Sequence, residues 1–225
     1  MDKDLLAGHR KRLRERFQKS GLAGFHNYEM VELILTFAIP RRDVKPLAKK
    51  LIDHFGNLAA LLDAPAEELK AIKGLGPNAA ILIKLFKEVA TEYRRVPIIG
   101  KNYLNSLRDV LNYCHHSLSG LRDEVFQVIY LNVRNEIIKT ETLQAGTVDQ
   151  SAVYPRKVVE AALRHNASAL VFTHNHPSGD PTPSEADKKL TRSLVQALQA
   201  IDVSVHDHLV VARDGYFSFR ESGLL

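Results

Sequence analysis

Two histidines and one aspartate in the second half of the chain have types and spacing that suit a metal ion. His174 and His176 are two positions apart, and Asp187 follows further along. Pro177 and Gly179 predict a turn directly after the histidines, which lets both imidazoles face one ion. Two imidazoles and one carboxylate are a ligand set typical of catalytic zinc, with a fourth position for water. The pattern predicts one zinc ion per chain, held by His174, His176 and Asp187.

The same stretch has a simpler interpretation as the start of a helix. Ser184 and Asp187 have the spacing of a capping box, in which serine and aspartate satisfy backbone N–H groups in the first turn. The histidines would then be ordinary loop residues. Capping does not explain two histidines followed by Pro, Gly, Asp and Pro after an apolar run, so we favour the metal site. Asp180, in the same loop, is an alternative carboxylate ligand.

The elements that must position these residues are predicted from the apolar spacing, which becomes strand-like in the second half of the chain. A helix begins at about residue 106, and two more are expected over 155–165 and 184–200. Strands are predicted over 125–133, 136–143, 169–173, 203–212 and 216–219. This order of elements indicates a mixed α/β or α+β domain. The two histidines follow one strand, and Asp187 lies one turn into the next helix.

The first half of the chain has a different apolar spacing. From residue 4 to about residue 93 the apolar residues recur every three or four positions, which predicts an all-α domain. The segment 94–101 has no clear period and contains a Pro and a Gly, which are typical of a linker. We therefore expect a helical domain over 1–97, a linker over 98–105 and a β-sheet domain over 106–225.

Composition sets further bounds. The chain has 225 residues, of which 45% are hydrophobic, and this suits one large or two small globular domains. No apolar run approaches the ~20 residues of a membrane-spanning helix, and the start lacks the pattern of a secretory signal. A cytoplasmic protein without a membrane partner is the expectation. The single cysteine, Cys114, excludes an intrachain disulfide and zinc sites built on paired cysteines.

The positive charge lies in the first half. Residues 1–97 hold 18 Lys and Arg against 12 Asp and Glu, a net charge of +6, whereas residues 98–225 have a net charge of −1. A basic module is suited to a polyanionic partner. The histidines divide the other way, with three before residue 98 and seven after it. The two halves are therefore expected to have different tasks.

Residues 68–80 match a helix-hairpin-helix pattern, in which two glycines flank an apolar residue between helices. Such a hairpin directs backbone N–H groups, together with the start of the second helix, at a phosphate. The residues expected to contact double-stranded DNA are Lys73, Gly74, Gly76 and Asn78. Further positive charge comes from Lys70 and Lys84. The alternative is a pair of helices that packs for structural reasons only.

The metal motif resembles that of a known family. The order His-x-His, seven residues, Ser, two residues, Asp is the signature of the JAMM (MPN+) metalloproteases, which include zinc-dependent isopeptidases. The run 174–187, with Tyr154-Pro155-Arg156 before it and Asp207-His208-Leu209 after it, more closely resembles the bacterial RadC family. The resemblance is strong over about 104–225 and extends to the helical half. It implies a JAMM/MPN-like (cytidine-deaminase-like) sheet flanked by helices, in an overall α+β chain.

The resemblance also implies roles for individual residues. A glutamate takes the proton of the zinc-bound water and passes it to the leaving amine of a peptide or isopeptide substrate. Glu124 opens the first long strand, where the family carries this residue; Glu136 and Glu141 are the other candidates. Ser184 donates to the oxyanion of the tetrahedral intermediate. Strand alternation places His206 and His208 on one face, and His208 is our candidate for orienting a ligand.

A second class of function stays open from the sequence. The RadC family has traditionally been described as DNA-repair proteins. Under that reading the chain is a DNA-associated repair or recombination factor, and its metal site is structural or acts on nucleic acid. A single zinc lacks the paired ions that many nucleases use, so hydrolysis of nucleic acid is the weaker alternative. The presence of a full ligand set together with Glu124 favours the hydrolase.

Overall fold

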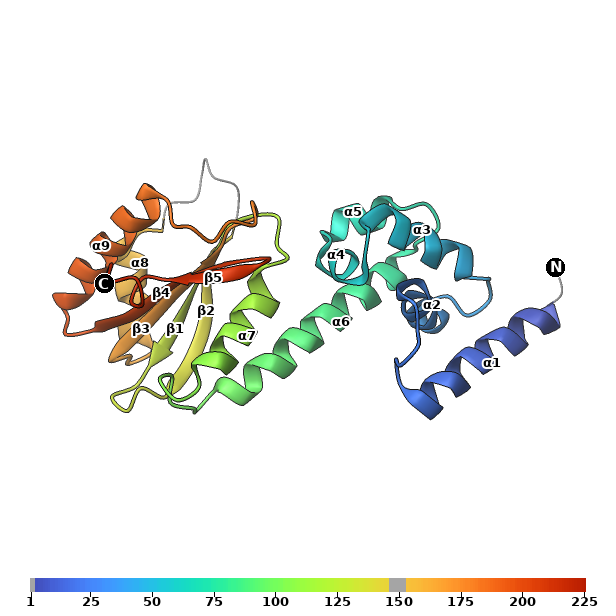
Figure 1. Ribbon diagram of the computed structural model, residues 1–225, viewed down its shortest axis with the longest axis horizontal. Helices are drawn as coiled ribbons and strands as arrows, with labels where there is room; N and C mark the ends of the chain where they lie inside the picture. The colour runs from blue at the N-terminus through green and yellow to red at the C-terminus, as the bar shows by residue number, and fades with distance from the viewer. Residues whose placement is uncertain (1–2, 146–152) are drawn as a thin grey trace. The chain divides into compact units, whose positions relative to one another are not determined.

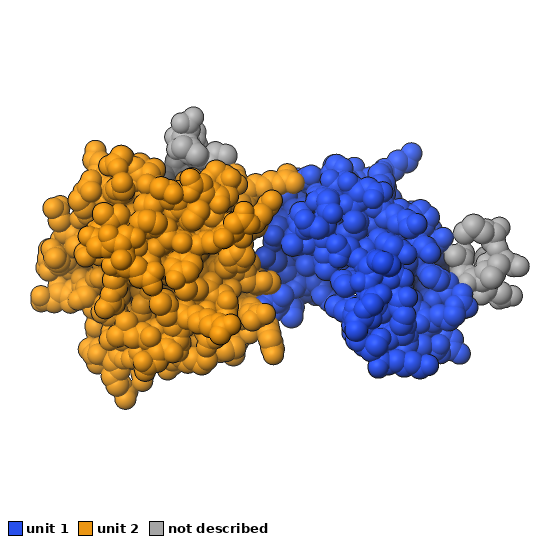
Figure 2. Space-filling model, viewed as in Figure 1, with its two compact units in different colours: residues 1–90 blue, residues 91–225 orange. Residues whose placement is uncertain are grey.

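The computed structural model describes residues 3–145 and 153–225, and the chain forms two compact units, residues 1–90 and 91–225 (Figure 2). Each unit has its own hydrophobic core. The segment 98–105, expected as a linker, lies inside the second unit. Ile98 and Tyr103 are 1% and 2% exposed, and they belong to the core of that unit.

The first unit is built from helices: α1 (Lys3–Ser20), α2 (Asn27–Ala38), α3 (Lys45–Phe55), α4 (Leu58–Asp63), α5 (Ala66–Ala71) and most of α6 (Pro77–Arg95). Gly56 ends α3 with a φ of +85°, and Asn57 caps α4 by accepting from the N–H of Ala60. The apolar residues of α2 to α6 recur at helical intervals and meet in one core, which includes Leu35 and Leu51. Leu13 of α1 packs in a smaller cluster with Phe25 and Leu33.

The second unit contains the end of α6 and the short 3₁₀ helix η1 (Val96–Ile98), followed by a sheet and three helices (Figure 1). The helices are α7 (Leu107–Leu118), α8 (Pro155–Arg164) and α9 (Glu185–Gln199). The strands are β1 (Val125–Leu131), β2 (Ile137–Ala145), β3 (Ala169–Asn175), β4 (Ser204–Ala212) and β5 (Gly215–Ser218).

The strands form one mixed sheet in the order β2-β1-β3-β4-β5. β1 pairs antiparallel with both β2 and β3, and β4 pairs antiparallel with β5. β3 and β4 are parallel, so the chain must cross over between them, and α9 makes that connection. The carboxyl end of β3 and the start of β1 therefore lie at the same edge of the sheet.

Both faces of the sheet are covered. On the face of α7, side chains such as Ile129 and Val171 form one core, and on the face of α8 and α9, Val128 and Phe172 belong to another. Every residue of β1 and β3 is buried, as expected for central strands between two helical layers. The predicted fold class is thus confirmed: an all-α part is followed by an α+β domain. Within the described residues, no helix is long and apolar enough to cross a membrane.

The strand β4 departs from the regular alternation that the sequence suggested. Leu170 pairs with Val205, but the next residue of β3, Val171, pairs with Asp207, so His206 is an extra residue at a bulge. Nε2 of His206 lies 2.6 Å from Oδ1 of Asn135, whereas His208 is fully buried and contacts Thr191 of α9. The expectation that His206 and His208 share a face is therefore wrong.

Candidate metal centre

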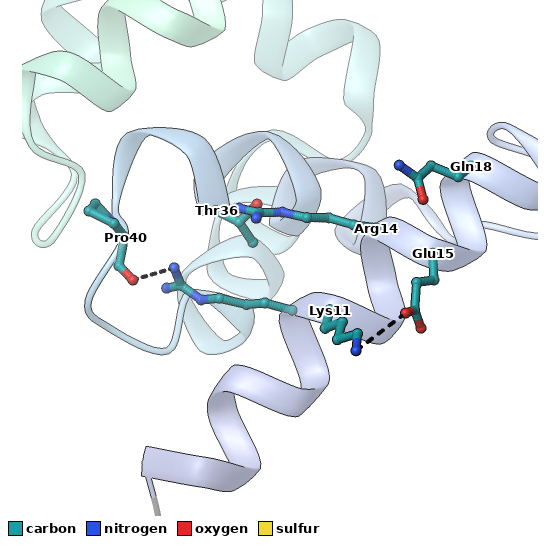
Figure 3. Close-up of a pocket in the computed structure, with 7 residues that line it drawn as sticks. Lys11, Arg14, Glu15, Gln18, Thr36 and Pro40 are labelled. Carbon is teal, nitrogen blue, oxygen red and sulfur yellow. Dashed lines mark hydrogen bonds and ion pairs between the residues drawn. The ribbon is translucent and has the colours of Figure 1, made fainter.

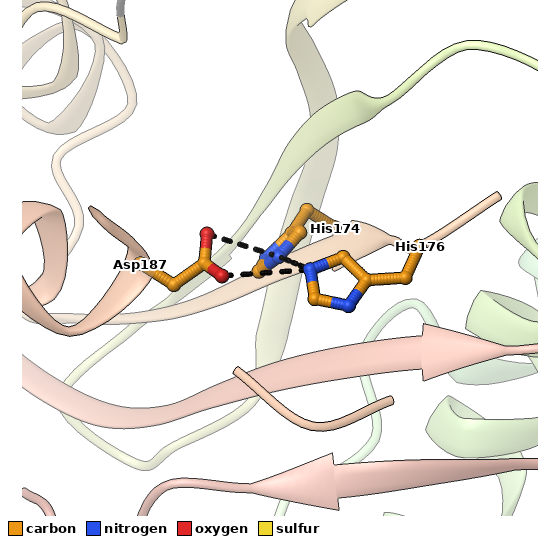
Figure 4. A group of neighbouring side chains, drawn as sticks. All are labelled: His174, His176 and Asp187. Atoms are coloured by element: carbon orange, nitrogen blue, oxygen red, sulfur yellow. Dashed lines mark hydrogen bonds and ion pairs between the residues drawn. The ribbon is translucent and has the colours of Figure 1, made fainter. Parts of the chain in front are cut away.

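The three predicted metal ligands meet at the end of β3. His174 is the penultimate residue of β3, His176 follows the strand, and Asp187 lies in the first turn of α9. A turn at 177–179 separates the two histidines from Asp187, and Gly179 in this turn has a φ of +92°. This positive φ is a conformation that glycine adopts without strain. The strand and helix thus direct all three side chains at one point (Figure 4).

The donor atoms have spacings that fit a tetrahedral ion. The Nε2 atoms of His174 and His176 are 3.1 Å apart, and they lie 3.3 and 3.4 Å from the two carboxylate oxygens of Asp187. In a tetrahedral zinc site with bonds of about 2.0–2.1 Å, neighbouring ligand atoms are about 3.3 Å apart. Within the described part of the chain, these are the only three such side chains grouped closely enough to hold an ion. The residues fit zinc.

Hydrogen bonds and burial act differently on the two imidazoles. The Nδ1 atom of His176 lies 2.8 Å from the carbonyl oxygen of Asp180 and donates to it, because a carbonyl accepts only. Burial lowers the pKa of His174 to about 4, against the charge of Asp187. The hydrogen bond with Asp187 raises the pKa of His176, against burial. His174 is therefore neutral near pH 7, as a metal ligand must be.

Asp187 is held as a carboxylate. Burial by itself would raise its pKa, but hydrogen bonds with His176 and Ser184 and the electrostatic effect of His174 hold the pKa well below its usual range. Oδ2 accepts from both the backbone N–H and the hydroxyl of Ser184, at 2.7 and 2.6 Å. Oδ1 is the oxygen that lies nearest Nε2 of His174.

Ser184 is the N-cap of α9. Its hydroxyl oxygen accepts from the N–H of Asp187 at 3.1 Å, and its hydroxyl proton is donated back to the Asp187 carboxylate. The capping box and the metal group thus share Asp187, so the two interpretations of the sequence do not exclude each other. The oxyanion role of Ser184 stays a prediction, and it requires the hydroxyl proton to turn away from Asp187.

Glu124 lies at the same edge of the sheet as the metal group. It is exposed and directly precedes β1, where Phe126 pairs with His174. Continuing this antiparallel register places Glu124 opposite His176, and alternation puts it on the face of the two histidines. Its negative charge contributes to the raised pKa of His176.

The start of β1 is held by a residue that the sequence did not single out. Asn175 is fully buried; its Oδ1 accepts from the N–H of Val125 at 2.8 Å, and its Nδ2 donates to the carbonyl oxygens of Asp123 and Leu121 at 3.0 and 3.4 Å. The signal was its position between two histidines in a strand, which sends its side chain to the opposite face.

The other two glutamates are engaged elsewhere. Glu136 precedes β2 at the opposite edge of the sheet, where it accepts from Asn132 Nδ2 at 2.7 Å. Glu141 lies in the middle of β2 and contacts Nε2 of His165 at 2.8 Å. The structure brings neither of them to the metal group. The Asp180 carboxylate accepts from the N–H of Thr182 and is outside the group as well.

His208 lies directly behind the metal group. Its Nε2 is 2.8 Å from Nδ1 of His174, and it is fully buried. Burial lowers the pKa of His208 well below its ordinary value, so the ring is neutral. Asp207, its neighbour, accepts instead from Ser218 and from the backbone of Arg220, on another side of β4.

The segment predicted as a helix-hairpin-helix spans the turn between α5 and α6, and the hairpin motif itself stays a prediction. Lys73, Gly74, Gly76 and Asn78 are all exposed there. Gly74 has a φ of +95°, and its carbonyl oxygen accepts from the Arg42 guanidinium. Two of the lysines expected nearby are engaged. Lys70 pairs with Glu67 at 2.6 Å, and the Lys84 ammonium donates to the carbonyl oxygens of Leu62 and Ala64.

Two adjoining pockets of the first unit have basic linings. One is lined by Arg10, Lys11, Arg14, Glu15, Gln18, Thr36 and Pro40 (Figure 3). The second shares Pro40 and also contains Ala38, Ile39, Arg41, Arg42, Gly74 and Gly76. Some of this charge holds the fold together, because the Arg10 guanidinium donates to the carbonyl oxygens of Ile39, Pro40 and Arg42.

Comparison with known families follows the division into two units. Residues 104–224 match the family of RadC-like JAB domains, which is more than half of the chain. The chain belongs to this family. The RadC-like match includes the metal group, Glu124 and His208. Residues 7–81 match a second family, the UPF0758 N-terminal domain, which includes the hairpin of α5 and α6.

The similarity to a curated relative spans almost the whole chain. A UPF0758 protein of Ruegeria pomeroyi is 43% identical over 217 residues, which span 96% of this chain and 97% of the relative. The similarity therefore includes residues of both units. The family sets the fold of the site.

Proposed function

We propose that the chain is a zinc-dependent hydrolase that cleaves a peptide or isopeptide bond. The observation that supports this most directly is the convergence of His174, His176 and Asp187, with donor atoms 3.1–3.4 Å apart, beside a glutamate on the same face. A purely structural site would be closed by four protein ligands, whereas three ligands leave a position open. Only three such side chains gather here within the described residues.

The residues of the chain divide the work of hydrolysis. When bound, zinc polarises a substrate carbonyl and lowers the pKa of a water. Glu124 accepts a proton from the attacking water and returns it to the leaving amine, as a general base and then a general acid. Its exposure at the sheet edge suits this role, because both substrate and water must reach it. Ser184 orients the Asp187 carboxylate by two hydrogen bonds to Oδ2.

Metal analysis of the purified full chain tests the ligand set. We expect one zinc per chain in the wild type and loss of that zinc in His174→Ala. His206→Ala is the matched control, because it removes a histidine that contacts Asn135 and lies outside the group. A wild-type chain without stoichiometric zinc contradicts the proposal.

The role of Glu124 is tested by Glu124→Gln, which keeps the shape of the side chain and removes its basicity. We expect full zinc content and a fall in turnover of about 10²- to 10⁴-fold. Turnover is measured by mass spectrometry on a pool of peptides and isopeptide-linked peptides. Glu136→Gln is the control, since that glutamate lies at the other edge of the sheet. Equal cleavage by Glu124→Gln and wild type contradicts the assignment.

A second candidate function belongs to the first unit. The adjoining pockets contain Arg10, Lys11, Arg14, Arg41 and Arg42 against a single acidic residue, Glu15, and one of them includes Gly74 and Gly76 of the hairpin. A basic surface of this kind favours the phosphate backbone of double-stranded DNA without reading its sequence. We propose that this unit delivers the hydrolase to such a partner.

Binding of duplex DNA to the full chain is measured at several salt concentrations. We expect affinity to fall steeply with salt, and Lys73→Ala to reduce the salt slope by about 1. The matched control is Lys139→Ala, an exposed lysine of the second unit. Affinity that changes neither with salt nor with Lys73 contradicts DNA binding and favours a protein partner.

A further inference from the structure

A chain of short, buried hydrogen bonds continues behind His174. Nδ1 of His174 lies 2.8 Å from Nε2 of His208, and Nδ1 of His208 lies 2.7 Å from the hydroxyl oxygen of Thr191. That hydroxyl lies 2.6 Å from the backbone carbonyl oxygen of Asp187. His208 and Thr191 are 0% and 1% exposed. The chain therefore links β3, β4 and α9 away from water.

The direction of each hydrogen bond in this chain follows from the last acceptor, the backbone carbonyl oxygen of Asp187. The carbonyl oxygen of Asp187 has no proton, so the Thr191 hydroxyl must donate to it. Because that hydroxyl has one proton, its oxygen accepts from Nδ1–H of His208. His208 is packed among the rings of Phe126, Phe172 and Phe219, whose centroids are 5.7, 5.8 and 4.8 Å from its own. A charged imidazolium in this apolar setting would be strongly disfavoured.

A neutral His208 with its proton on Nδ1 has a lone pair on Nε2. It can only accept from His174, whose proton must then be on Nδ1. The lone pair of His174 is consequently on Nε2, the atom that faces His176 and Asp187. The Thr191 hydroxyl, which is two hydrogen bonds away from His174, thus determines which nitrogen of His174 has a free lone pair.

We propose that Thr191 and His208 are positioning residues that fix His174 in the tautomer able to bind the metal. This inference rests on the proposed metal role of His174. The relay also joins two ligands by a second route, since Asp187 offers its carboxylate to the site and its backbone carbonyl to Thr191. Thr191 is one helical turn after Asp187, so α9 carries both ends of the relay.

Zinc affinity of the full chain tests the relay through two variants of one residue. Thr191→Val keeps the shape of the side chain and removes the hydroxyl, whereas Thr191→Ser keeps the hydroxyl. By competition with a chromophoric chelator, we expect Thr191→Val to bind zinc about 10- to 100-fold more weakly. Thr191→Ser should stay within a few-fold of the wild type. Equal affinity in Thr191→Val and wild type overturns the proposal.

A second measurement needs neither a variant nor zinc. Long-range ¹H–¹⁵N spectra of the metal-free wild-type chain distinguish imidazole protonated on Nδ1 from imidazole protonated on Nε2. We expect both His174 and His208 to carry the proton on Nδ1. A proton on Nε2 of His174 overturns the relay even if the chain binds zinc. The expected tautomers in a chain that fails to bind zinc would instead overturn the proposed function and leave the relay standing.

Discussion

At the scale of single residues, the site depends on which atoms of its side chains carry protons as well as on where those side chains lie. His174, His176 and Asp187 each have a hydrogen-bond partner on the side away from the metal position: His208, the Asp180 carbonyl and Ser184. Such partners orient the ligands before any ion arrives. Burial makes the charged form of His174 unfavourable, so we expect the stability of the metal-free chain to depend on pH.

Burial lowers the pKa of His174 to about 4 and also lowers that of His208 well below its ordinary value. The unfolded chain takes up these two protons near the ordinary histidine pKa, but the folded chain does not. Stability should therefore be fully present above about pH 6.5 and fall as the pH drops toward 4, by about 3 kcal/mol for His174 alone. Urea unfolding of metal-free protein across this range measures it.

His176 has the opposite sign, which provides an internal control. Its pKa is raised by the hydrogen bond with Asp187, so its contribution is present below about pH 6.5 and lost as the pH rises through the raised pKa. Metal-free stability should thus be highest near pH 6.5. In His176→Ala the loss on the alkaline side should disappear, while the loss on the acid side remains. A stability that is flat between pH 4 and 6.5 contradicts the burial of neutral His174 and His208.

At the scale of elements, the sequence predicted most of the positions and fewer of the contacts. The buried strand before His174, the turn at Gly179 and the helix after Ser184 all follow from local patterns. The bulge at His206 did not, because β4 is buried on both faces from Asp207 onward and has no alternation there that a shift of one residue would disturb. Thr191 and Asn175 were missed since their roles depend on partners far away in the chain.

The hairpin between α5 and α6 offers a prediction of its own, because its two glycines differ. Gly74 has a φ of +95°, and an added Cβ would lie 3.4 Å from the Arg42 guanidinium; Gly76 has neither constraint. Gly74→Ala should lower the free energy of unfolding of the first unit by about 1–2 kcal/mol. Gly76→Ala, the matched control, should have little effect. Chemical denaturation compares the two variants, and an equal loss of unfolding free energy in both would argue against a constraint specific to Gly74.

At the scale of the whole molecule, the two units have separate cores and separate family matches. The segment expected as a linker belongs to the second unit because Ile98 and Tyr103 pack into its core. Pro97 and Gly100 marked this part of the chain as irregular, and residues 99–105 are in neither a helix nor a strand, but irregular backbone is compatible with buried side chains. The metal residues all lie in the second unit, so a ligand there acts on that unit's stability.

Calorimetry of the full chain should accordingly show two unfolding transitions. Zinc at about 100 times its dissociation constant should stabilise the second unit by about 2.7 kcal/mol and leave the first unchanged. Gly74→Ala assigns the transitions, because it changes only the first unit. A single transition that zinc shifts as a whole would show that the units unfold together.

The tripeptide 174–176 has a mechanical consequence for the site. Two of its side chains face the metal position, while Asn175 between them grips the backbone at 121–125, the segment that carries Glu124. The two proposed histidine ligands and Glu124, the proposed proton acceptor, are therefore tied to each other through the same short segment of backbone at the end of β3.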